Sequence, residues 1–177
     1  MLNNNGSDNI QVEVVDMNGN VLFEKDKLQA HKDGDLHKAF SIFVFNNKSE
    51  LLLQQRAPGK YHSGGLWSNT CCSHPLSGEP TPEAASRRLR EEMGISCDLT
   101  EIFTTQYKFE CDNGLIEHEF NTVFKGEFDG EPKINPLEVS NTRWIKLRQL
   151  RKEVATKPKA FTSWLPHLLD ELYLIWI

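Results

Sequence analysis

The clearest structural signal in this sequence is a single helix with strand-like segments on both sides. It spans residues 81–94, TPEAASRRLREEMG. Thr81 can act as its N-cap, Pro82 suits the first turn, and Glu83 is favourable near the positive end of the helix dipole. Gly94 is typical of the residue that ends a helix. One helix between strands predicts an α+β domain built on a mixed sheet.

Apolar alternation around turn residues predicts the strands. Residues 10–27 form two alternating runs around Asn18-Gly19, which is a strong hairpin signal, and residues 39–56 repeat the strand–turn–strand pattern. Further expected elements are strands at Ile102–Phe109, Ile116–Phe128 and Thr142–Leu147, a turn at residues 112–114, and helices near Arg148–Ala155 and Ser163–Tyr173. We expect one domain over residues 1–177, with residues 1–9 flexible.

Composition limits the classes of partner. The 177 residues carry a net charge of −5, so a basic nucleic-acid-binding surface is not expected. The first ten residues lack the basic and apolar regions of a signal peptide, and the apolar run at 172–177 is too short to span a bilayer. Cysteines at 71, 72, 97 and 111 do not suit a disulfide framework. We therefore expect a cytoplasmic protein with reduced thiols, with no nucleic-acid or membrane partner and with a monomer as the default state.

Charged residues crowd the second half of the predicted helix. Arg87 precedes Glu91 by four residues, and Arg88 precedes Glu92 by four, so each pair can contribute about 0.3 kcal/mol. Carboxylates near a helix C-terminus nevertheless oppose the helix dipole. A solvated charged face is the ordinary interpretation of this cluster, and a site for a metal ion or a phosphate is the alternative.

Histidines and glutamates outside the helix form a second candidate site. In a strand, Glu117 and Glu119 point to one face and His118 to the other, because side chains alternate. Taken separately, such residues are usually solvent-exposed. Together, imidazole nitrogens and carboxylate oxygens suit a site for Mn, Mg, Fe or Zn. The candidate ligands are His31, His37, His74, Glu117 and Glu119.

Part of the helix resembles a known signature. Glu79, seven further residues and RRLREEMGI at 87–95 are similar to the Nudix box, in which a loop–helix–loop holds divalent cations against a diphosphate. This copy departs from the pattern at two positions, since Ser73 stands in place of the first glycine and Arg88 in place of a glutamate. The loss of that carboxylate is expected to weaken hydrolysis, which depends on the full acidic set.

Longer stretches resemble one branch of that superfamily. DKLQAH, LHKAFSIFVFN, LLLQQRAPGKYHSGGLWSNTCCSHP, YKFECDNGLIEHE and FTSWLPHLL are similar to the type 1 isopentenyl-diphosphate delta-isomerases, over about residues 11–170. The resemblance implies a Nudix-like mixed β-sheet sandwich with flanking helices. It also implies conversion of isopentenyl diphosphate to dimethylallyl diphosphate by a metal-assisted 1,3-allylic proton shift, which supplies isoprenoid biosynthesis.

The same resemblance implies roles for individual residues. Cys72 takes the position of the catalytic cysteine, and Glu119 with Tyr107 that of the acid–base group; Cys71 is not expected to be the catalyst. The five histidine and glutamate ligands would hold one metal ion, and Glu92 with the backbone carbonyl of Cys72 would hold Mg²⁺. We expect neighbouring cations or a metal-linked backbone to lower the pKa of the Cys72 thiol towards the working pH. The residues implied to bind substrate are Lys27, Arg56, Lys60 and Arg88 around the diphosphate and Trp164 at the hydrocarbon tail.

Two other functions stay open from the sequence. A Nudix pyrophosphohydrolase would release phosphate with Mg²⁺ and would not need Cys72. A Nudix-fold binding module would hold a diphosphate without turnover. Mn²⁺, Mg²⁺ and Zn²⁺ all remain candidates for the histidine and glutamate site. No glycine-rich phosphate loop is visible, so no flavin is expected. For Cys97 and Cys111 we expect packing or surface thiols.

Overall fold

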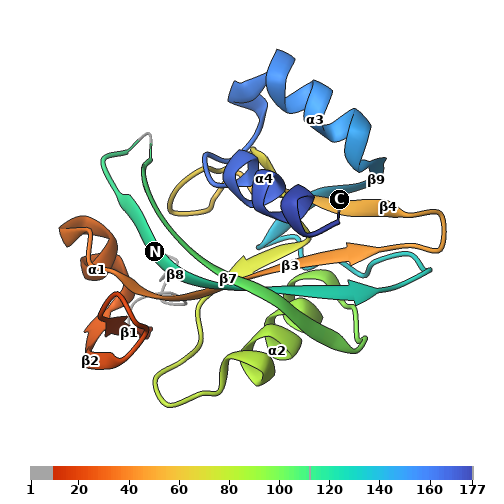
Figure 1. Cartoon of the computed structure of the whole chain (residues 1–177). Helices are drawn as coiled ribbons and strands as arrows, with labels where there is room; N and C mark the ends of the chain where they lie inside the picture. Colours follow the sequence, from red (N-terminus) through yellow and green to blue (C-terminus); the bar gives the residue numbers. More distant parts are fainter. Residues whose placement is uncertain (1–9, 112, 177) are drawn as a thin grey trace, which may run out of the picture.

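The protein folds around one mixed sheet with helices on both of its faces (Figure 1). The structure is a computed structural model that describes residues 10–111 and 113–176. Its strands are β1 (Gln11–Val15), β2 (Val21–Asp26), β3 (His37–Phe45), β4 (Glu50–Arg56), β5 (Trp67–Ser68), β6 (Cys71–Ser73), β7 (Leu99–Glu110), β8 (Ile116–Glu127) and β9 (Val139–Lys146). Its helices are α1 (Lys27–Asp33), α2 (Thr81–Met93), α3 (Leu147–Thr156), the 3₁₀ turn η1 (Pro158–Ala160) and α4 (Leu165–Trp176).

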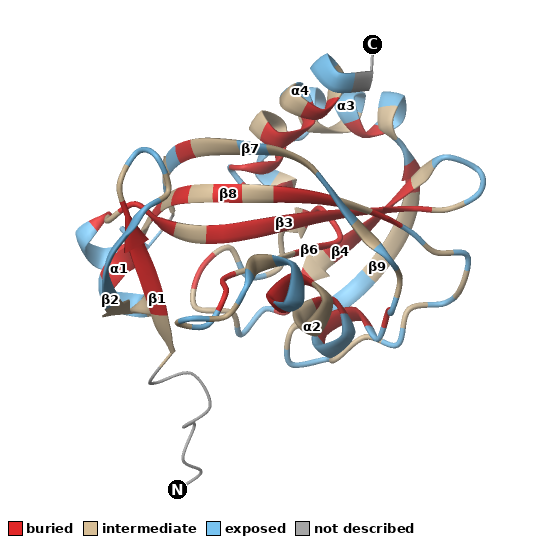
Figure 2. Cartoon of the chain, turned by 60° about the horizontal axis from the view of Figure 1, so that its bottom comes forward, coloured by how far each residue is buried: buried red, intermediate tan, exposed pale blue. Residues whose placement is uncertain are grey.

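Strand β3 is the centre of the sheet. It pairs in parallel with β8 along its whole length and antiparallel with β1, β4 and β6. Strand β7 extends the sheet beyond β8, and β9 extends it beyond β4. Eight of the nine residues of β3 are buried, as expected for a strand covered on both faces (Figure 2).

The two sheet faces belong to two separate apolar clusters. Phe40 and Ile42 of β3 pack with Leu89 and Met93 of α2 on one face. Phe43, the next residue on the opposite side, packs on the other face with a cluster that includes four leucines of α4. Figure 1 shows α2 below the sheet and α4 with α3 above it. The predicted α+β sandwich is therefore confirmed.

Most predicted elements are confirmed, and one capping prediction is wrong. The β1–β2 hairpin, the β3–β4 pair, and helices α2, α3 and α4 lie where the sequence places them. Gly94 ends α2 in the left-handed conformation, with φ of 65°. Thr81, however, is the first helical residue, and the N-cap is Pro80, which makes no side-chain capping hydrogen bond. The expected flexibility of residues 1–9, and residue 112 of the expected turn, lie outside the described residues.

Helix α1 is the main element that the sequence does not predict. Its seven residues begin after Asp26, whose carboxylate accepts a hydrogen bond from the backbone N–H of Gln29, and they end at Gly34 with φ of 71°. The helix is too short to show apolar periodicity. None of the helices in the described part of the chain combines the length and hydropathy that a bilayer crossing requires.

Candidate active site and metal centre

The two adjacent cysteines lie on strand β6, which pairs with β3. Successive side chains of a strand alternate, so the two thiols point to opposite faces of the sheet. Cys71 lies opposite Ile42 and is fully buried in the α2-side cluster. Cys72 lies opposite Ser41, and its thiol donates a hydrogen bond to Asn69 Oδ1 at 3.0 Å. The two cysteines thus have different surroundings, and Cys71 packs in the apolar core.

The strand register brings the five candidate metal ligands together. His37 of β3 lies directly opposite Glu119 of β8, and Glu117 lies on the same side of β8, two residues earlier. One ligand atom from each of the five side chains lies within 4.8 Å of all the others, and all five residues are buried. The set is His31, His37, His74, Glu117 and Glu119.

Two of these histidines have a fixed tautomer that suits a ligand. His31 Nδ1 lies 2.7 Å from the carbonyl of Lys27, and His37 Nδ1 lies 2.8 Å from the carbonyl of Asp35. A carbonyl oxygen only accepts hydrogen bonds, so Nδ1 carries the proton in both rings. The bare Nε2 atoms therefore face the interior of the cluster, as in metal-ligating histidines that are oriented by an outer hydrogen bond.

The unpaired atoms inside the cluster fit a divalent cation. Within residues 10–111 and 113–176, His31 Nε2 and Glu117 Oε2 are buried without hydrogen-bond partners, and they lie 3.6 Å apart. His74 Nε2 lies 3.1 Å from both His37 Nε2 and Glu119 Oε1. Lone pairs and carboxylate charges that face one another in a buried space are costly unless a cation lies between them. The buried group and the Nudix fold together support the use of a divalent metal ion.

The two carboxylate oxygens of Glu119 have different neighbours. Oε1 faces His74, whereas Oε2 accepts hydrogen bonds from the Tyr107 hydroxyl and, at 2.9 Å, from Asn121 Nδ2. Burial, followed by the nearby charge of Glu117, holds the pKa of Glu119 well above its usual value. Burial also raises the pKa of Tyr107. Burial and the neighbouring carboxylate thus favour the protonated form of the Glu119 carboxyl.

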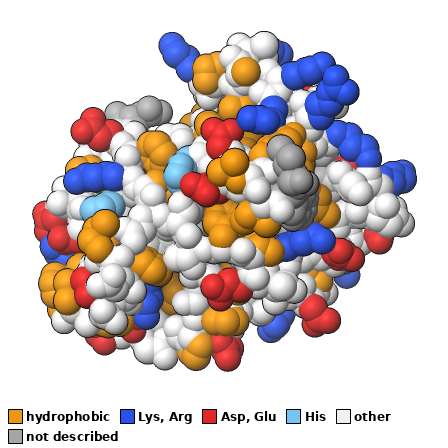
Figure 3. All heavy atoms as spheres, in the orientation of Figure 1, with side chains coloured by type: hydrophobic (Ala, Val, Ile, Leu, Met, Phe, Trp, Pro, Cys, Tyr) orange, Lys and Arg blue, Asp and Glu red, His pale blue; other side chains and the backbone are white. Residues whose placement is uncertain are grey.

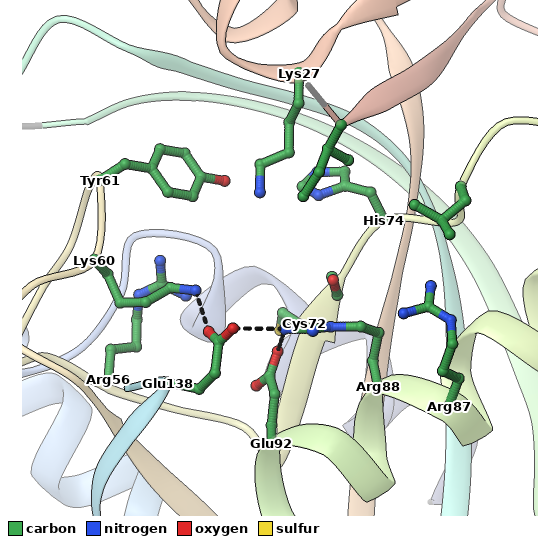
Figure 4. Close-up of a pocket in the computed structure, with 13 residues that line it drawn as sticks. Lys27, Arg56, Lys60, Tyr61, Cys72, His74, Arg87, Arg88, Glu92 and Glu138 are labelled. Atoms are coloured by element: carbon green, nitrogen blue, oxygen red, sulfur yellow. Dashed lines mark hydrogen bonds and ion pairs between the residues drawn. The ribbon is translucent and has the colours of Figure 1, made fainter. Parts of the chain in front are cut away.

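A cavity of about 200 Å³ opens above Cys72 (Figure 4). Figure 4 shows the ends of its cationic side chains converging on the open space. Its lining includes the four predicted diphosphate-binding residues Lys27, Arg56, Lys60 and Arg88, together with Cys72 and Glu92. On the face drawn in Figure 3, acidic and basic side chains are interspersed, so this concentration of cations is a local feature.

The cations of the cavity act on one another. Burial, and then the positive charges of Lys60 and Arg88, lower the pKa of Lys27 to about 8. Arg88 pairs with Glu92 at 2.7 Å and with Glu138 at 3.1 Å, and Lys60 also pairs with Glu138. Although burial alone would raise it, these cations lower the pKa of Glu138 to about 2. The ion pairs hold the arginine and lysine heads around the cavity in the absence of a ligand.

Some residues of the site escaped the sequence analysis. Tyr61 and Glu138 line the cavity, and His62 lies 2.5 Å from Glu117. Loops deliver all three, so neither strand alternation nor a helical face indicates them. Trp164 is not among the residues that line this cavity; it is buried, with its ring 5.5 Å from the guanidinium carbon of Arg56.

Comparison with known proteins identifies the family. A family profile described as a NUDIX domain matches residues 35–165. The chain is 49% identical over 162 residues to "Isopentenyl-diphosphate Delta-isomerase 2" of Aromatoleum aromaticum, covering 92% of this chain and 86% of that protein. The chain belongs to the isopentenyl-diphosphate Delta-isomerase family. "Isopentenyl-diphosphate Delta-isomerase" of Pectobacterium atrosepticum is also 49% identical to this chain, over 87% of this chain and 86% of its own length.

The fold of this isomerase-family chain is also found in distant solved structures. DR0079 from Deinococcus radiodurans superimposes with a TM-score of 0.78 at 18% identity, over 92% of this chain and 99% of that one. The NUDIX domain of Shewanella oneidensis NrtR, solved with ADP ribose, has a TM-score of 0.61 at 14% identity, over 80% of this chain and 88% of its own. These likenesses establish the Nudix fold alone.

The Nudix helix of this family member has a rearranged charge pattern. Arg87 binds Glu79 through two contacts of 2.7 Å, and Arg88 reaches Glu91 and Glu92. Both i, i+4 pairs that the sequence predicts, Arg87–Glu91 and Arg88–Glu92, are present. Because Arg88 stands where the Nudix box has a glutamate, the helix presents a cation to the cavity instead of one of the usual carboxylates.

The expected state of the catalytic-position cysteine is wrong for the protein without ligand. Cys72 was expected to have a lowered thiol pKa because of neighbouring cations. Burial instead raises its pKa to about 12, despite the hydrogen bonds to Ser41 and Asn69 that lower it. Burial thus favours the protonated form of the Cys72 thiol in this isomerase-family chain.

Proposed function

We propose that this protein interconverts isopentenyl diphosphate and dimethylallyl diphosphate in isoprenoid biosynthesis. Membership of the isomerase family supports this reaction. The observation that carries the proposal is the closeness of two proton-holding groups: Cys72, which lines the cation-lined cavity, and Glu119, whose charge acts on the Cys72 thiol. The Cys72 thiol lies beside a ring of cations, and the buried Tyr107–Glu119–Asn121 group lies on neighbouring strands of the same sheet.

The diphosphate is proposed to bind among the cavity cations. Lys27, Arg56, Lys60 and Arg88 come from α1, β4, the loop after β4, and α2, so four separate segments contribute one positive charge each. Phosphate oxygens would replace Glu138 as the partner of Lys60 and Arg88. Charge-assisted hydrogen bonds of this kind are about twice as strong as neutral ones.

The proton shift requires an acid and a base. Glu119, hydrogen-bonded to Tyr107, is the proposed acid; it protonates the terminal methylene carbon of the alkene and leaves a tertiary carbocation. Cys72 is the proposed base: once the thiol has lost its own proton to solvent, the thiolate, stabilised by the cavity cations, removes a proton from the carbon on the diphosphate side. The electrons of that C–H bond form the new double bond. In the reverse reaction the Cys72 thiol gives a proton to the alkene and the Glu119 carboxylate removes one, so the two groups exchange roles.

The carbocation must be protected while it exists. Burial excludes water, which would otherwise add to the cation. Trp164 is the proposed aromatic neighbour of the hydrocarbon tail, where a cation–π interaction contributes roughly 2 kcal/mol when desolvated.

Two ions are proposed to assist. His31, His37, His74, Glu117 and Glu119 would hold Mn²⁺, Mg²⁺ or Zn²⁺. Glu92 and the backbone carbonyl of Cys72 would hold a Mg²⁺ that accompanies the diphosphate. When bound, such ions neutralise phosphate and carboxylate charge and polarise the Glu119 carboxyl. No flavin is expected.

The alternative Nudix reaction, hydrolysis of a diphosphate, is less well supported. Arg88 removes one carboxylate from the Nudix set and engages Glu91 and Glu92. A non-catalytic binding module, the other alternative, gains nothing from a buried proton-holding carboxyl near a thiol. The isomerase accounts for both features.

Deuterium incorporation tests the proposal. The purified protein is incubated with isopentenyl diphosphate in deuterated water, with and without a chelator. We expect deuterium-labelled dimethylallyl diphosphate, formed only without the chelator. Phosphate release with no allylic product would support hydrolysis, and binding of the substrate without either product would support the binding module.

Several expectations stay predictions. These are a single domain over the chain, a monomer, a cytoplasmic location, and no nucleic-acid or membrane partner. A native mass spectrum tests the monomer directly.

A further inference from the structure

Glu117 has a second set of neighbours that the proposed isomerase site does not use. Its Oε2 faces His31 in the five-ligand cluster, whereas its Oε1 lies 2.5 Å from His62 Nε2. On this second side, ligand atoms of His62, Cys111 and Glu117 all lie within 4.8 Å of one another. One carboxylate thus separates two groups of ligand atoms.

The His62 ring is fixed in place, with one buried nitrogen directed at this group. Its Nδ1 lies 3.1 Å from the Ser63 hydroxyl, and its ring packs edge-on against Tyr61 and Trp164. The residue is 5% exposed. The buried Nε2 atom faces Glu117 Oε1 at 2.5 Å and meets no other polar partner among the described residues.

His62 therefore repeats the situation of His31. Each histidine directs a buried Nε2 at one oxygen of Glu117, His31 at Oε2 and His62 at Oε1. An ion on either side of Glu117 would replace the direct contact between the ring nitrogen and the carboxylate oxygen. A bridging carboxylate with one nitrogen ligand on each oxygen is a geometry that two neighbouring ions can occupy.

Cys111 supplies the third ligand from a defined position. It follows β7, and its backbone N–H donates to the carbonyl of Leu115 at 2.8 Å across the β7–β8 turn. Cys111 also lines a second cavity, of about 500 Å³, together with Ser63 and Phe161. Among the described residues, the lining of this cavity and that of the cation-lined cavity do not overlap, so Cys111 borders a different space from Cys72.

We propose that His62, Cys111 and Glu117 bind a second transition-metal ion next to the five-ligand centre, with Glu117 bridging the two. Thiolate, imidazole and carboxylate form a ligand set that suits Zn²⁺, and three protein ligands leave a fourth position for water. The ion is additional to the proposed isomerase machinery. Its presence is measurable without turnover.

Metal counting provides the first test. The protein is stripped with chelator, loaded with Zn²⁺, freed of excess metal and analysed by elemental mass spectrometry against protein concentration. We expect two zinc ions per chain in the wild type and one in Cys111→Ser. Cys97→Ser, which changes a half-buried thiol elsewhere, is the matched control and should keep two.

A cobalt spectrum gives a second readout that does not depend on a variant's yield. Co²⁺ bound by a thiolate shows an intense near-ultraviolet charge-transfer band. We expect this band in the wild type and in Cys72→Ser and Cys97→Ser, and its loss in Cys111→Ser. A wild type that holds one ion and lacks the band, or a band that survives Cys111→Ser, overturns the proposal. A protein that binds two ions but lacks isomerase activity would support the second metal site and contradict the proposed function.

Discussion

At the scale of single residues, position relative to the sheet decides chemistry more than residue type does. Cys71 and Cys72 are neighbours with the same side chain. Strand alternation places the first against α2 and the second beside Ser41 and Asn69. Of the two thiols, that of Cys72 lines the cation-lined cavity and that of Cys71 does not, so Cys72 is the one placed to exchange a proton with a bound ligand.

Substitution of these two cysteines separates the two roles. We expect Cys72→Ala to lower kcat by about 10²–10⁴-fold, because it removes a proton-transfer group, while the melting temperature changes little. Cys71→Ala should retain kcat within a few-fold and instead lose about 1 kcal/mol of stability through a small cavity. Steady-state turnover and thermal unfolding measure both effects. Near wild-type turnover in Cys72→Ala would remove this residue from the mechanism.

Lys27 predicts a pH dependence of substrate capture. Its pKa of about 8 means that the free protein loses this positive charge as the pH rises through 8. We therefore expect kcat/KM to fall above pH 8 as diphosphate binding weakens. Lys27→Arg should remain flat to about pH 10, because arginine stays protonated. If the two proteins decline in parallel between pH 8 and 10, another group causes the change.

At the scale of secondary-structure elements, the sequence predicts what local rules determine. Pro82, Glu83 and Gly94 predict helix α2, and the turn residues predict the β1–β2 hairpin; the structure contains both elements. Helix α1 and strands β5 and β6 are missed, because seven, two and three residues are too few to show a period. Pro80 caps α2 by conformation alone, which explains why a rule based on side-chain capping selected Thr81.

The end of α2 provides a test of element stability. Gly94 has φ of 65°, and a Cβ there would lie 2.6 Å from the carbonyl oxygen of Lys133. We expect Gly94→Ala to cost about 3 kcal/mol, combining left-handed backbone strain with a clash. Gly78→Ala is the matched control, since Gly78 has φ of 72° and nothing within 4 Å of a built Cβ. It should cost about 1–2 kcal/mol. Equal losses in thermal unfolding would show that the clash relaxes.

At the scale of the whole molecule, the site depends on contacts that local sequence does not encode. The resemblance to isomerases indicated the five metal ligands, and the structure gathers them from α1, β3, the segment after β6, and β8. Tyr61, His62 and Glu138 were not indicated, because each is brought in by a loop. Their positions follow from the packed fold, in which residues 62 and 117 become neighbours across the sheet edge.

Because the ligands come from four segments, a bound ion should stabilise the entire fold. Ligand binding to the native state alone adds about 2.7 kcal/mol at 100 times Kd. For a chain of this length that corresponds to a rise in Tm of about 5–10 °C. We expect this difference between protein loaded with Mn²⁺ or Zn²⁺ and protein treated with chelator, measured by calorimetry. The rise should largely vanish in His37→Ala, which removes a buried ligand. It should persist in His118→Ala, because that side chain points away from Glu117 and Glu119 and contacts the Gly34 carbonyl. Identical melting of the loaded and chelated proteins would mean that these five buried side chains do not form a metal centre.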